Sequence, residues 1–258
     1  MISDISEKSG RYLYCVINGE VDGLGLLGID SEKVYTLSFK GLTVVVHNCD
    51  PQPYYSGDND MVAAWVEAHH KVVEGYWLKY GNVVPFTFNT IIKSDDCPPE
   101  ELLFKWLEDN CHYILGKLRI IEGCKEYGVQ VVMDSKKAAE ALADSNSEIV
   151  GLRKELARSP AGKAFLIKEK INSRLKKLVE EEADRLFRES YSSIERSVER
   201  VQVEKIKKMD RSRIMLLNVS CLADERQCGV LGAVLERINC IPFLEVIFSG
   251  PWPAYSFM

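Results

Sequence analysis

The residues of this 258-residue chain best suited to metal binding or nucleophilic catalysis are eight cysteines and four histidines. His69 and His70 are adjacent, so on a helix they point about 100° apart and cannot easily bind one metal ion together. His47 and Cys49 are close in sequence, but a catalytic thiol needs a base at a set geometry, which spacing alone does not supply. We therefore expect histidines that are packed or hydrogen-bonded, and no catalytic, cofactor-binding or metal-binding residue.

The cysteines also lack the spacing of a metal or redox motif, because none forms a Cys-x-x-Cys pair. Cys15 and Cys221 stand in apolar runs that are typical of strands, where a reduced thiol packs as a small hydrophobic group. The first 17 residues are acidic and polar rather than basic and then apolar, which indicates no secretory signal. No apolar run approaches the roughly 20 residues that span a bilayer. We expect a cytoplasmic protein with reduced cysteines and no membrane partner.

A glycine-rich segment, Gly23-Leu-Gly25-Leu-Leu-Gly28, invites comparison with a phosphate-binding loop. In such loops the phosphate binds at the N-terminus of a following helix. Here Ile29-Asp30-Ser31 and a new strand pattern follow instead. We interpret the segment as a mobile loop and expect no nucleotide cofactor.

The net charge of −5 conceals an uneven distribution. Residues 1–150 carry 13 Lys and Arg against 23 Asp and Glu, whereas residues 151–213 carry 18 against 11. A basic stretch could bind an acidic partner or nucleic acid. Its charges are mixed in sign, however, and few aromatic residues lie among them. We therefore expect a solvated helix face and no nucleic-acid partner.

Hydrophobic periodicity and turn residues predict alternating strands and helices along the whole chain. In the first half these are a strand at 11–17, a hairpin of strands at 34–39 and 42–47, a helix at 59–80, a strand at 83–92 and a helix from 98 to about 117. In the second half they are strand material at 118–134, helices at 135–145 and 159–191, strands at 194–203 and 214–222, a helix at 224–238 and a strand at 243–249.

From residue 129 onward this order is β-α-β-β-α-β, which is the ferredoxin-like unit with an antiparallel sheet and helices on one face. The predicted fold class is α+β with two domains, the second ferredoxin-like and containing a long helix. We place an N-terminal α+β domain at 1–118, the ferredoxin-like domain at 119–250 and an extended C-terminal tail at 251–258.

The tail contains three aromatic residues and two prolines in a short space: Pro251, Trp252, Pro253, Tyr255 and Phe257. Each proline fixes one backbone φ angle and favours an extended course. Aromatic side chains gain free energy when they leave water. We expect these five residues to dock, either on the body of the same chain or on a partner protein.

The ending Gly250-Pro-Trp-Pro-Ala-Tyr-Ser-Phe257 closely resembles the GPWPPYSF terminus of the gas vesicle protein GvpF/GvpL family. Five further segments support the resemblance in the expected order and cover nearly the whole chain. Arg11–Ile17 is similar to the family's YLYGV-type first strand. His70–Glu74 and Val83–Thr90 are similar to its H-x-x-V and VLPVRFGT segments. Lys125–Val131 is similar to its E-x-G-V-K-V strand, and Ser159–Leu166 to its P-x-G-x-A-Y-L helix opening.

Two positions depart from the family pattern. Phe86-Thr87-Phe88-Asn89 replaces the basic and glycine positions of the VRFGT segment, and Ala254 replaces the second proline of the tail motif. If the family's arginine contacts a partner, this chain must make that contact differently.

The resemblance implies a minor component or assembly factor of gas vesicles, with no enzymatic activity and no cofactor. It also implies a location at the gas vesicle and partners among the small, very hydrophobic wall subunit and other accessory proteins. A subunit with a large apolar surface aggregates unless it is covered, and an accessory protein can cover it with a sheet edge or a helix groove. Two alternatives remain open: a small-molecule enzyme that uses His70, and a regulatory binding module on the ferredoxin-like scaffold.

Overall fold

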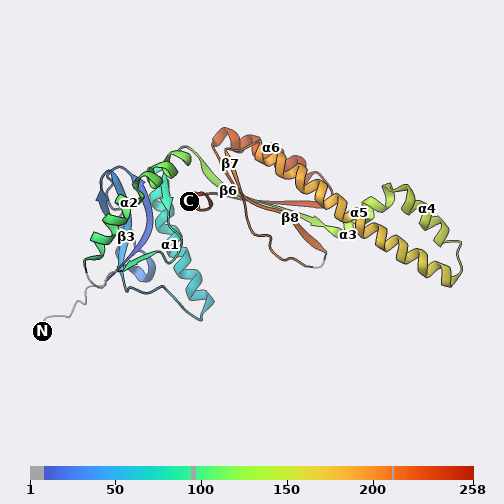
Figure 1. Cartoon of the computed structure of the whole chain (residues 1–258), viewed down its shortest axis with the longest axis horizontal. Coiled ribbons are helices and arrows are strands. Elements are labelled where there is room, and N and C mark those ends of the chain that lie inside the picture. The colour runs from blue at the N-terminus through green and yellow to red at the C-terminus, as the bar shows by residue number, and fades with distance from the viewer. Residues whose placement is uncertain (1–8, 94–96, 211) are drawn as a thin grey trace. The chain divides into compact units, whose positions relative to one another are not determined.

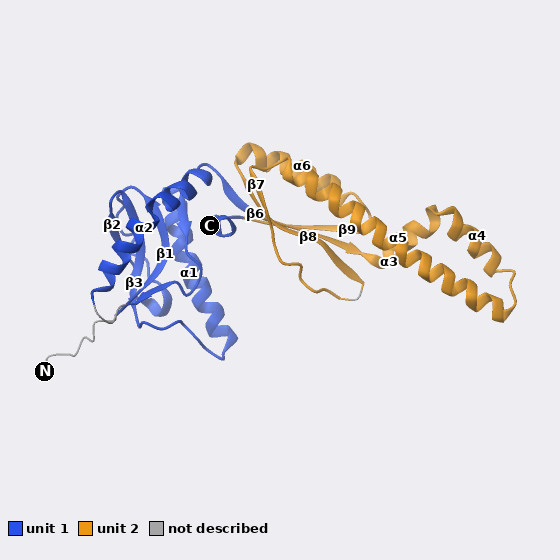
Figure 2. Cartoon of the chain, viewed as in Figure 1, with its two compact units in different colours: residues 1–126, 251–258 blue, residues 127–250 orange. Residues whose placement is uncertain are grey.

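The structure is a computed structural model that describes residues 9–93, 97–210 and 212–258. The chain divides into two compact units (Figure 2). Unit 1 contains residues 1–126 and 251–258, and unit 2 contains residues 127–250. The expectation that the N-terminus is no secretory signal falls partly on residues 1–8, which lie outside the described residues.

Unit 1 is built on an antiparallel sheet with strand order β2-β3-β1-β4, and β5 also pairs with β1. Two helices, α1 and α2, pack against β1 and β4 (Figure 1). The elements are β1 (Gly10–Asn18), β2 (Tyr35–Phe39), β3 (Leu42–Cys49), α1 (Asn59–Tyr80), β4 (Val83–Pro85), β5 (Ile91–Lys93) and α2 (Pro99–Ile120), with a short 3-10 helix η1 (Ile29–Ser31) after β1.

The predicted hairpin is confirmed as β2 and β3, joined by Lys40 and Gly41. Both connecting residues have positive φ angles, 48° and 81°. Such angles match the right-handed twist of the flanking strands in a two-residue turn. The hairpin also holds the residues before the glycine-rich loop, because Gly19 N–H donates to the Gly41 carbonyl and Val21 N–H to the Thr43 hydroxyl. The loop itself, which we expected to be mobile, is bonded to α1, since Leu24 N–H donates to the Tyr76 hydroxyl at 3.1 Å. It leads into η1 rather than into an α-helix.

The helix predicted at 59–80 is confirmed with the same bounds. The Asp58 carboxylate accepts a hydrogen bond from Asp60 N–H at 2.9 Å and caps its first turn. Gly81, with φ of 77°, ends it. The next helix differs from the prediction: α2 continues to Ile120, because Leu118 belongs to its buried face. Unit 1 continues beyond α2 to Glu126.

The single strand predicted at 83–92 is wrong, because it is two short strands. β4 ends at Pro85, which has no N–H to continue a ladder. A turn with Asn89 at φ of 69° follows, and β5 begins at Ile91. Both strands pair with β1, opposite its C-terminal and N-terminal parts respectively.

Unit 2 contains a four-stranded sheet with order β7-β8-β6-β9. The long helix α5 and the helix α6 pack against this sheet and against each other (Figure 1). Its elements are β6 (Lys125–Asp134), α3 (Ser135–Ser145), α4 (Ser147–Leu156), α5 (Ala161–Glu195), β7 (Arg200–Val203), β8 (Arg213–Ala223), α6 (Glu225–Asn239) and β9 (Leu244–Trp252).

Several predicted elements of unit 2 need correction. The strand expected at 194–203 is β7 alone, because Ile194 continues the buried helical spacing of Leu186 and Ser190 to the end of α5. The short helix α4 was not predicted. Its N-cap is Asn146, whose side chain accepts from Ile149 N–H at 3.1 Å directly after α3. The helix predicted at 135–145 is confirmed as α3.

The C-terminal segment is also more regular than expected. β9 continues through Gly250 and Pro251 to Trp252, and a 3-10 turn, η2 (Tyr255–Phe257), follows. Strand pairing therefore carries the first two tail residues, which the sequence placed in an irregular segment.

Each unit has its own core. Tyr12, Tyr14 and Tyr76 are completely buried in unit 1, and Val129, Val131 and Leu217 are buried in unit 2. Cys15 and Cys221 lie in these two cores, as predicted. Among the described residues, no helix combines the length and apolar character needed to cross a membrane.

Candidate partner-binding surfaces

The C-terminal tail lies against α1 of unit 1 through His70. The Trp252 ring meets the His70 imidazole edge-on, with 5.6 Å between ring centroids. The Tyr255 hydroxyl is 3.2 Å from His70 Nδ1, within hydrogen-bonding distance. His70 is thus a structural contact of the tail in this conformation.

A buried carboxylate holds the next residue of the tail. Glu126 is 7% exposed, and its two oxygens accept from the backbone N–H of Ser256 at 2.8 Å and from the Ser256 hydroxyl at 2.7 Å. Lys117 on α2 donates to the Phe257 carbonyl at 2.7 Å. A charged partner strengthens such hydrogen bonds, so residues Ser256 and Phe257 are held by three charge-assisted hydrogen bonds.

The five predicted tail residues divide into two groups by exposure. Pro253 and Phe257 are buried, and Tyr255 is partly buried, whereas Pro251 is exposed and Trp252 is 39% exposed. The buried group joins the tail to unit 1. The exposed group leaves apolar surface at the end of β9, where a partner could bind it; this second role remains a prediction.

The other histidines of interest are in the core of unit 1. Tyr12 hydroxyl donates to His69 Nδ1 at 2.9 Å, and His69 Nε2 donates to the Phe86 carbonyl at 3.1 Å. The His47 ring nitrogens are 2.7 Å and 3.0 Å from the hydroxyls of Tyr14 and Tyr54. The prediction of hydrogen-bonded histidines is confirmed, and it extends to a connected network of phenols and imidazoles.

Burial controls the acid–base properties of this network. It lowers the pKa of His69 to about 4, because the charged imidazolium would lose its hydration. Burial also raises the pKa of the Tyr12 and Tyr14 phenols well above their usual values. Backbone N–H groups of Asn89 and Ile29 donate to these two hydroxyls at 3.1 Å and oppose the shift in part. His69, Tyr12 and Tyr14 are therefore neutral near pH 7 and act as hydrogen-bonding groups.

The burial and hydrogen bonding of His69 and His70 do not favour the alternative of a small-molecule enzyme. A general acid or base must reach its substrate and should titrate near the working pH. His69 does neither, since it is 3% exposed, and His70 is engaged by the tail. Within the described ranges, no three His, Cys, Asp or Glu side chains gather in a way that could hold a metal ion.

An exposed apolar strand forms a second surface, in unit 2. β9 lies at one edge of the sheet, next to β6. Ile247 and Phe248 are 40% and 45% exposed, and no charged residue follows Glu245 in this strand. Phe248 also stacks on Tyr127, with 5.4 Å between centroids. Val246 N–H in this strand donates to the Asn239 side chain at 3.1 Å. An edge strand presents its remaining outward backbone groups together with apolar side chains.

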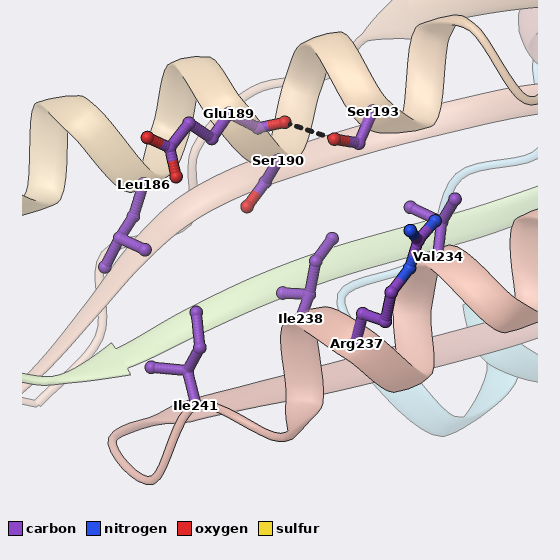
Figure 3. A pocket seen from close by; sticks show the side chains of 8 residues that line it. All are labelled: Leu186, Glu189, Ser190, Ser193, Val234, Arg237, Ile238 and Ile241. Carbon is purple, nitrogen blue, oxygen red and sulfur yellow. Dashed lines mark hydrogen bonds between the residues drawn. The ribbon is translucent and has the colours of Figure 1, made fainter.

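A small hollow between α5 and α6 forms a third surface (Figure 3). Its volume is about 200 Å³, which is below the roughly 300 Å³ at which small-molecule pockets begin. The Ser190 hydroxyl points into it, and Ser193 donates to the Glu189 carbonyl at its rim. The hollow can receive one side chain of a partner. It is lined by Leu186, Glu189, Ser190, Ser193, Val234, Arg237, Ile238 and Ile241.

The residues that hold the tail, and the exposed edge strand, were not predicted from the sequence. Glu126 and Lys117 carry no special signal in sequence, because their tail partners are 130 and 140 positions away. For β9, the uncharged Val246-Ile247-Phe248 run was visible, but its place at the edge depends on strand order.

This chain is similar to gas vesicle proteins. Residues 10–258 match the family described as gas vesicle synthesis protein GvpL/GvpF. Gas vesicle protein L1 of Halobacterium salinarum is 30% identical over 259 residues, covering 97% of this chain and 90% of that protein. Gas vesicle protein L of Haloferax mediterranei is 25% identical, covering 89% and 72%.

Solved structures show the same fold. The crystal structure of the gas vesicle protein GvpF from Anabaena sp. PCC7120 aligns with a TM-score of 0.71 at 18% identity. The alignment covers 96% of this chain and 98% of that one. The structure of GvpF from Microcystis aeruginosa aligns with a TM-score of 0.65. The mixed α and β class predicted from the sequence is confirmed.

Proposed function

The chain belongs to the gas vesicle GvpL/GvpF family, and from that premise we propose that it is a non-enzymatic minor component or assembly factor that binds the hydrophobic wall subunit during vesicle formation. Its relatives place its role with gas vesicles. Binding of the wall subunit, and of other accessory proteins, is our extension of that role.

The observation that supports this proposal best is the exposed edge strand β9. A wall subunit with a large apolar surface needs a partner that covers apolar side chains and satisfies backbone groups. Strand addition at a sheet edge does both, because the ladder supplies hydrogen bonds and alternate side chains supply apolar contact. Ile247 is the side chain of β9 we expect to contact the wall subunit, since it is 40% exposed.

We interpret unit 2 as a ferredoxin-like domain that presents this edge. The strand order β7-β8-β6-β9 supports the interpretation, because the second and third strands of the unit are neighbours and the first strand is central. The connection from β6 to β7 contains three helices rather than one. The long helix α5 is the last of the three.

The experiment is co-purification of the tagged full chain with the wall subunit from cells that make gas vesicles. We expect the wild-type chain to recover the wall subunit, and Ile247→Lys to lose most of it. The matched control is Val203→Lys on β7, the opposite edge strand, where Val203 is 60% exposed. Equal recovery by both variants would reject the β9 surface, and no recovery by the wild-type chain would reject the proposal.

Two further observations would place the protein in the assembly process. Cells that lack the protein should form no vesicles, and normal vesicles without it would contradict the proposed role. Washed, purified vesicles that still contain the protein would identify a retained wall constituent, whereas its absence would identify a released assembly factor.

A further inference from the structure

A second surface of unit 2 combines exposed apolar side chains with excess positive charge. We call it the helical arm, defined as α4 and the first half of α5, residues 147–178. α4 lies alongside α5 (Figure 1), and the two share a small apolar core that includes Ile149, Ile167 and Ile171. The arm carries nine Lys and Arg and three Asp and Glu, a net charge of +6.

The apolar part of the surface is at the start of α5. Phe165 and Leu166 are 64% and 68% exposed, although both are large apolar residues. They are out of phase with the buried stripe of Ile167 and Ile171, so they face away from α4. Exposed apolar groups that lie next to each other are typical of a binding surface.

The basic part follows along the same exposed face. Leu166, Lys170, Ser173 and Lys177 are exposed and recur at helical spacing. Phe165, Lys168, Asn172 and Lys176 form a neighbouring exposed stripe with the same arrangement. Each stripe therefore begins with an apolar residue and continues with two lysines and one neutral polar residue over about 17 Å, at roughly 1.5 Å per residue.

The arm's own carboxylates leave much of this charge unpaired. Glu148 pairs with Arg174 and Glu155 with Lys163, at 2.9 Å and 2.8 Å. In the part of the chain that the structure describes, no ion pair joins Lys168 or Lys170 to a carboxylate. Glu169 is the remaining acidic residue of the arm. The charge of Lys168 and Lys170 is therefore available to a partner, whereas Lys176 and Lys177 pair with Glu180 and Glu181 on the next turn of α5, at 4.0 Å and 3.8 Å.

We propose that the helical arm binds an acidic amphipathic helix of a partner protein. That helix would be three to four turns long, with apolar side chains at one end and carboxylates on the following turns. The charge complements the exposed lysines, and the apolar end covers Phe165 and Leu166. This proposal is independent of wall-subunit binding, which uses β9.

The arrangement favours a protein helix over two other anionic partners. Nucleic acid would pair with the lysines but would leave the apolar pair exposed. A helix embedded in a membrane surface has apolar residues along its whole length, whereas here they occupy one turn of the exposed face.

The test is fluorescence anisotropy of the full chain with a labelled 16-residue Ala-based peptide that has two leucines in its first turn and Glu at i, i+4 spacing. Binding should weaken steeply with added salt. A peptide with Lys in place of Glu should not bind. A third peptide, with Ser in place of both leucines, should bind at least tenfold more weakly.

Two variants of the chain locate the site. Lys168→Glu with Lys170→Glu, and separately Phe165→Ser with Leu166→Ser, should each weaken binding at least tenfold. The matched control is Lys207→Glu with Lys208→Glu, which makes the same charge change at two exposed lysines outside the arm. It should change affinity less than twofold, and circular dichroism should show that all three variants fold.

Three results would overturn the proposal. One is absence of peptide binding at low salt. Another is an equal loss in the Lys207 and Lys208 control, which would indicate attraction to net charge alone. The third is binding of phosphatidylserine vesicles that depends on Phe165 and Leu166 while the peptide does not bind, which would assign the surface to a membrane.

Discussion

The buried core of unit 1 includes imidazole and phenol groups, whereas the core of unit 2 is almost entirely apolar. In the described residues, the buried polar side chains of unit 1 are Thr43, His47, His69 and Glu126, and those of unit 2 are three serines. Unit 1 also carries the excess negative charge of the chain. The two units should therefore respond differently to pH, to lost hydrogen bonds and to lost volume.

This difference has a physical basis. A buried polar network stabilises only when every member has a partner, since an unsatisfied group costs about 1–3 kcal/mol. An apolar core instead responds to cavities. We therefore expect the stability of unit 1 to depend on the protonation and hydrogen bonding of its buried groups. We expect that of unit 2 to depend on how completely its core is filled.

The largest effect should come from a cavity in unit 2. Leu217 on β8 is 1% exposed, and Leu217→Ala should lower the free energy of unfolding by about 2–5 kcal/mol. Chemical denaturation monitored by circular dichroism measures this. The loss should not depend on pH between 4 and 7, and a pH-dependent loss would contradict the contrast.

Acid should destabilise unit 1 through His69. Its pKa is about 4 in the folded protein and near 6.5 when unfolded, so the unfolded chain binds more protons between these values. Stability is therefore complete above pH 6.5 and falls as the pH drops toward 4, by about 3 kcal/mol. Unfolding measured across this range should show the slope.

The control for the acid effect is His69→Gln, which removes the titrating group but not its neighbour His70. The variant should be less stable at pH 7, because the bonds to Tyr12 and Phe86 are disturbed. Its stability should change less than that of the wild type between pH 6.5 and 4. An identical slope would assign the effect to other groups.

A smaller effect is expected at the tail. Trp252 is 39% exposed and contacts His70, so Trp252→Ala should lower stability by about 1–2 kcal/mol rather than by the amount for a fully buried aromatic. Thermal unfolding measures this. An unchanged melting temperature with lost wall-subunit binding would instead assign Trp252 to a partner. No change in either property would exclude both roles.

The smallest effect should come from the surface ion pairs of unit 2. Arg185 bonds Glu182 and Glu189, both at 2.6 Å, on the exposed side of α5. Arg185→Ala should lower stability by less than about 1 kcal/mol, because exposed pairs are screened by water and salt. The difference from wild type should diminish in 1 M salt. A loss as large as that of Leu217→Ala would show that unit 2 depends on its charges.

Elements set by interactions between residues close in sequence were predicted well, and features set by distant residues were not. α1 and α3 were predicted to the residue, because a capping aspartate and a 3.6-residue pattern lie within the segment itself. The strand predicted at 194–203 was wrong, because the residue type of Ile194 is compatible both with a strand and with the last turn of α5. Only packing against the rest of unit 2 selects the helical conformation.

The sequence by itself determined the mixed fold class, the family and most element positions, since these depend on the spacing of nearby residues and on short sequence motifs. Only the tertiary structure decided that Ser256 meets Glu126, that His69 is shielded from water and that β9 lies at a sheet edge. The reason is distance along the chain. A hydrogen bond between residues 130 positions apart produces no periodic pattern in the sequence. Whether a strand lies at an edge depends on the order of strands in the sheet, which the sequence does not give directly.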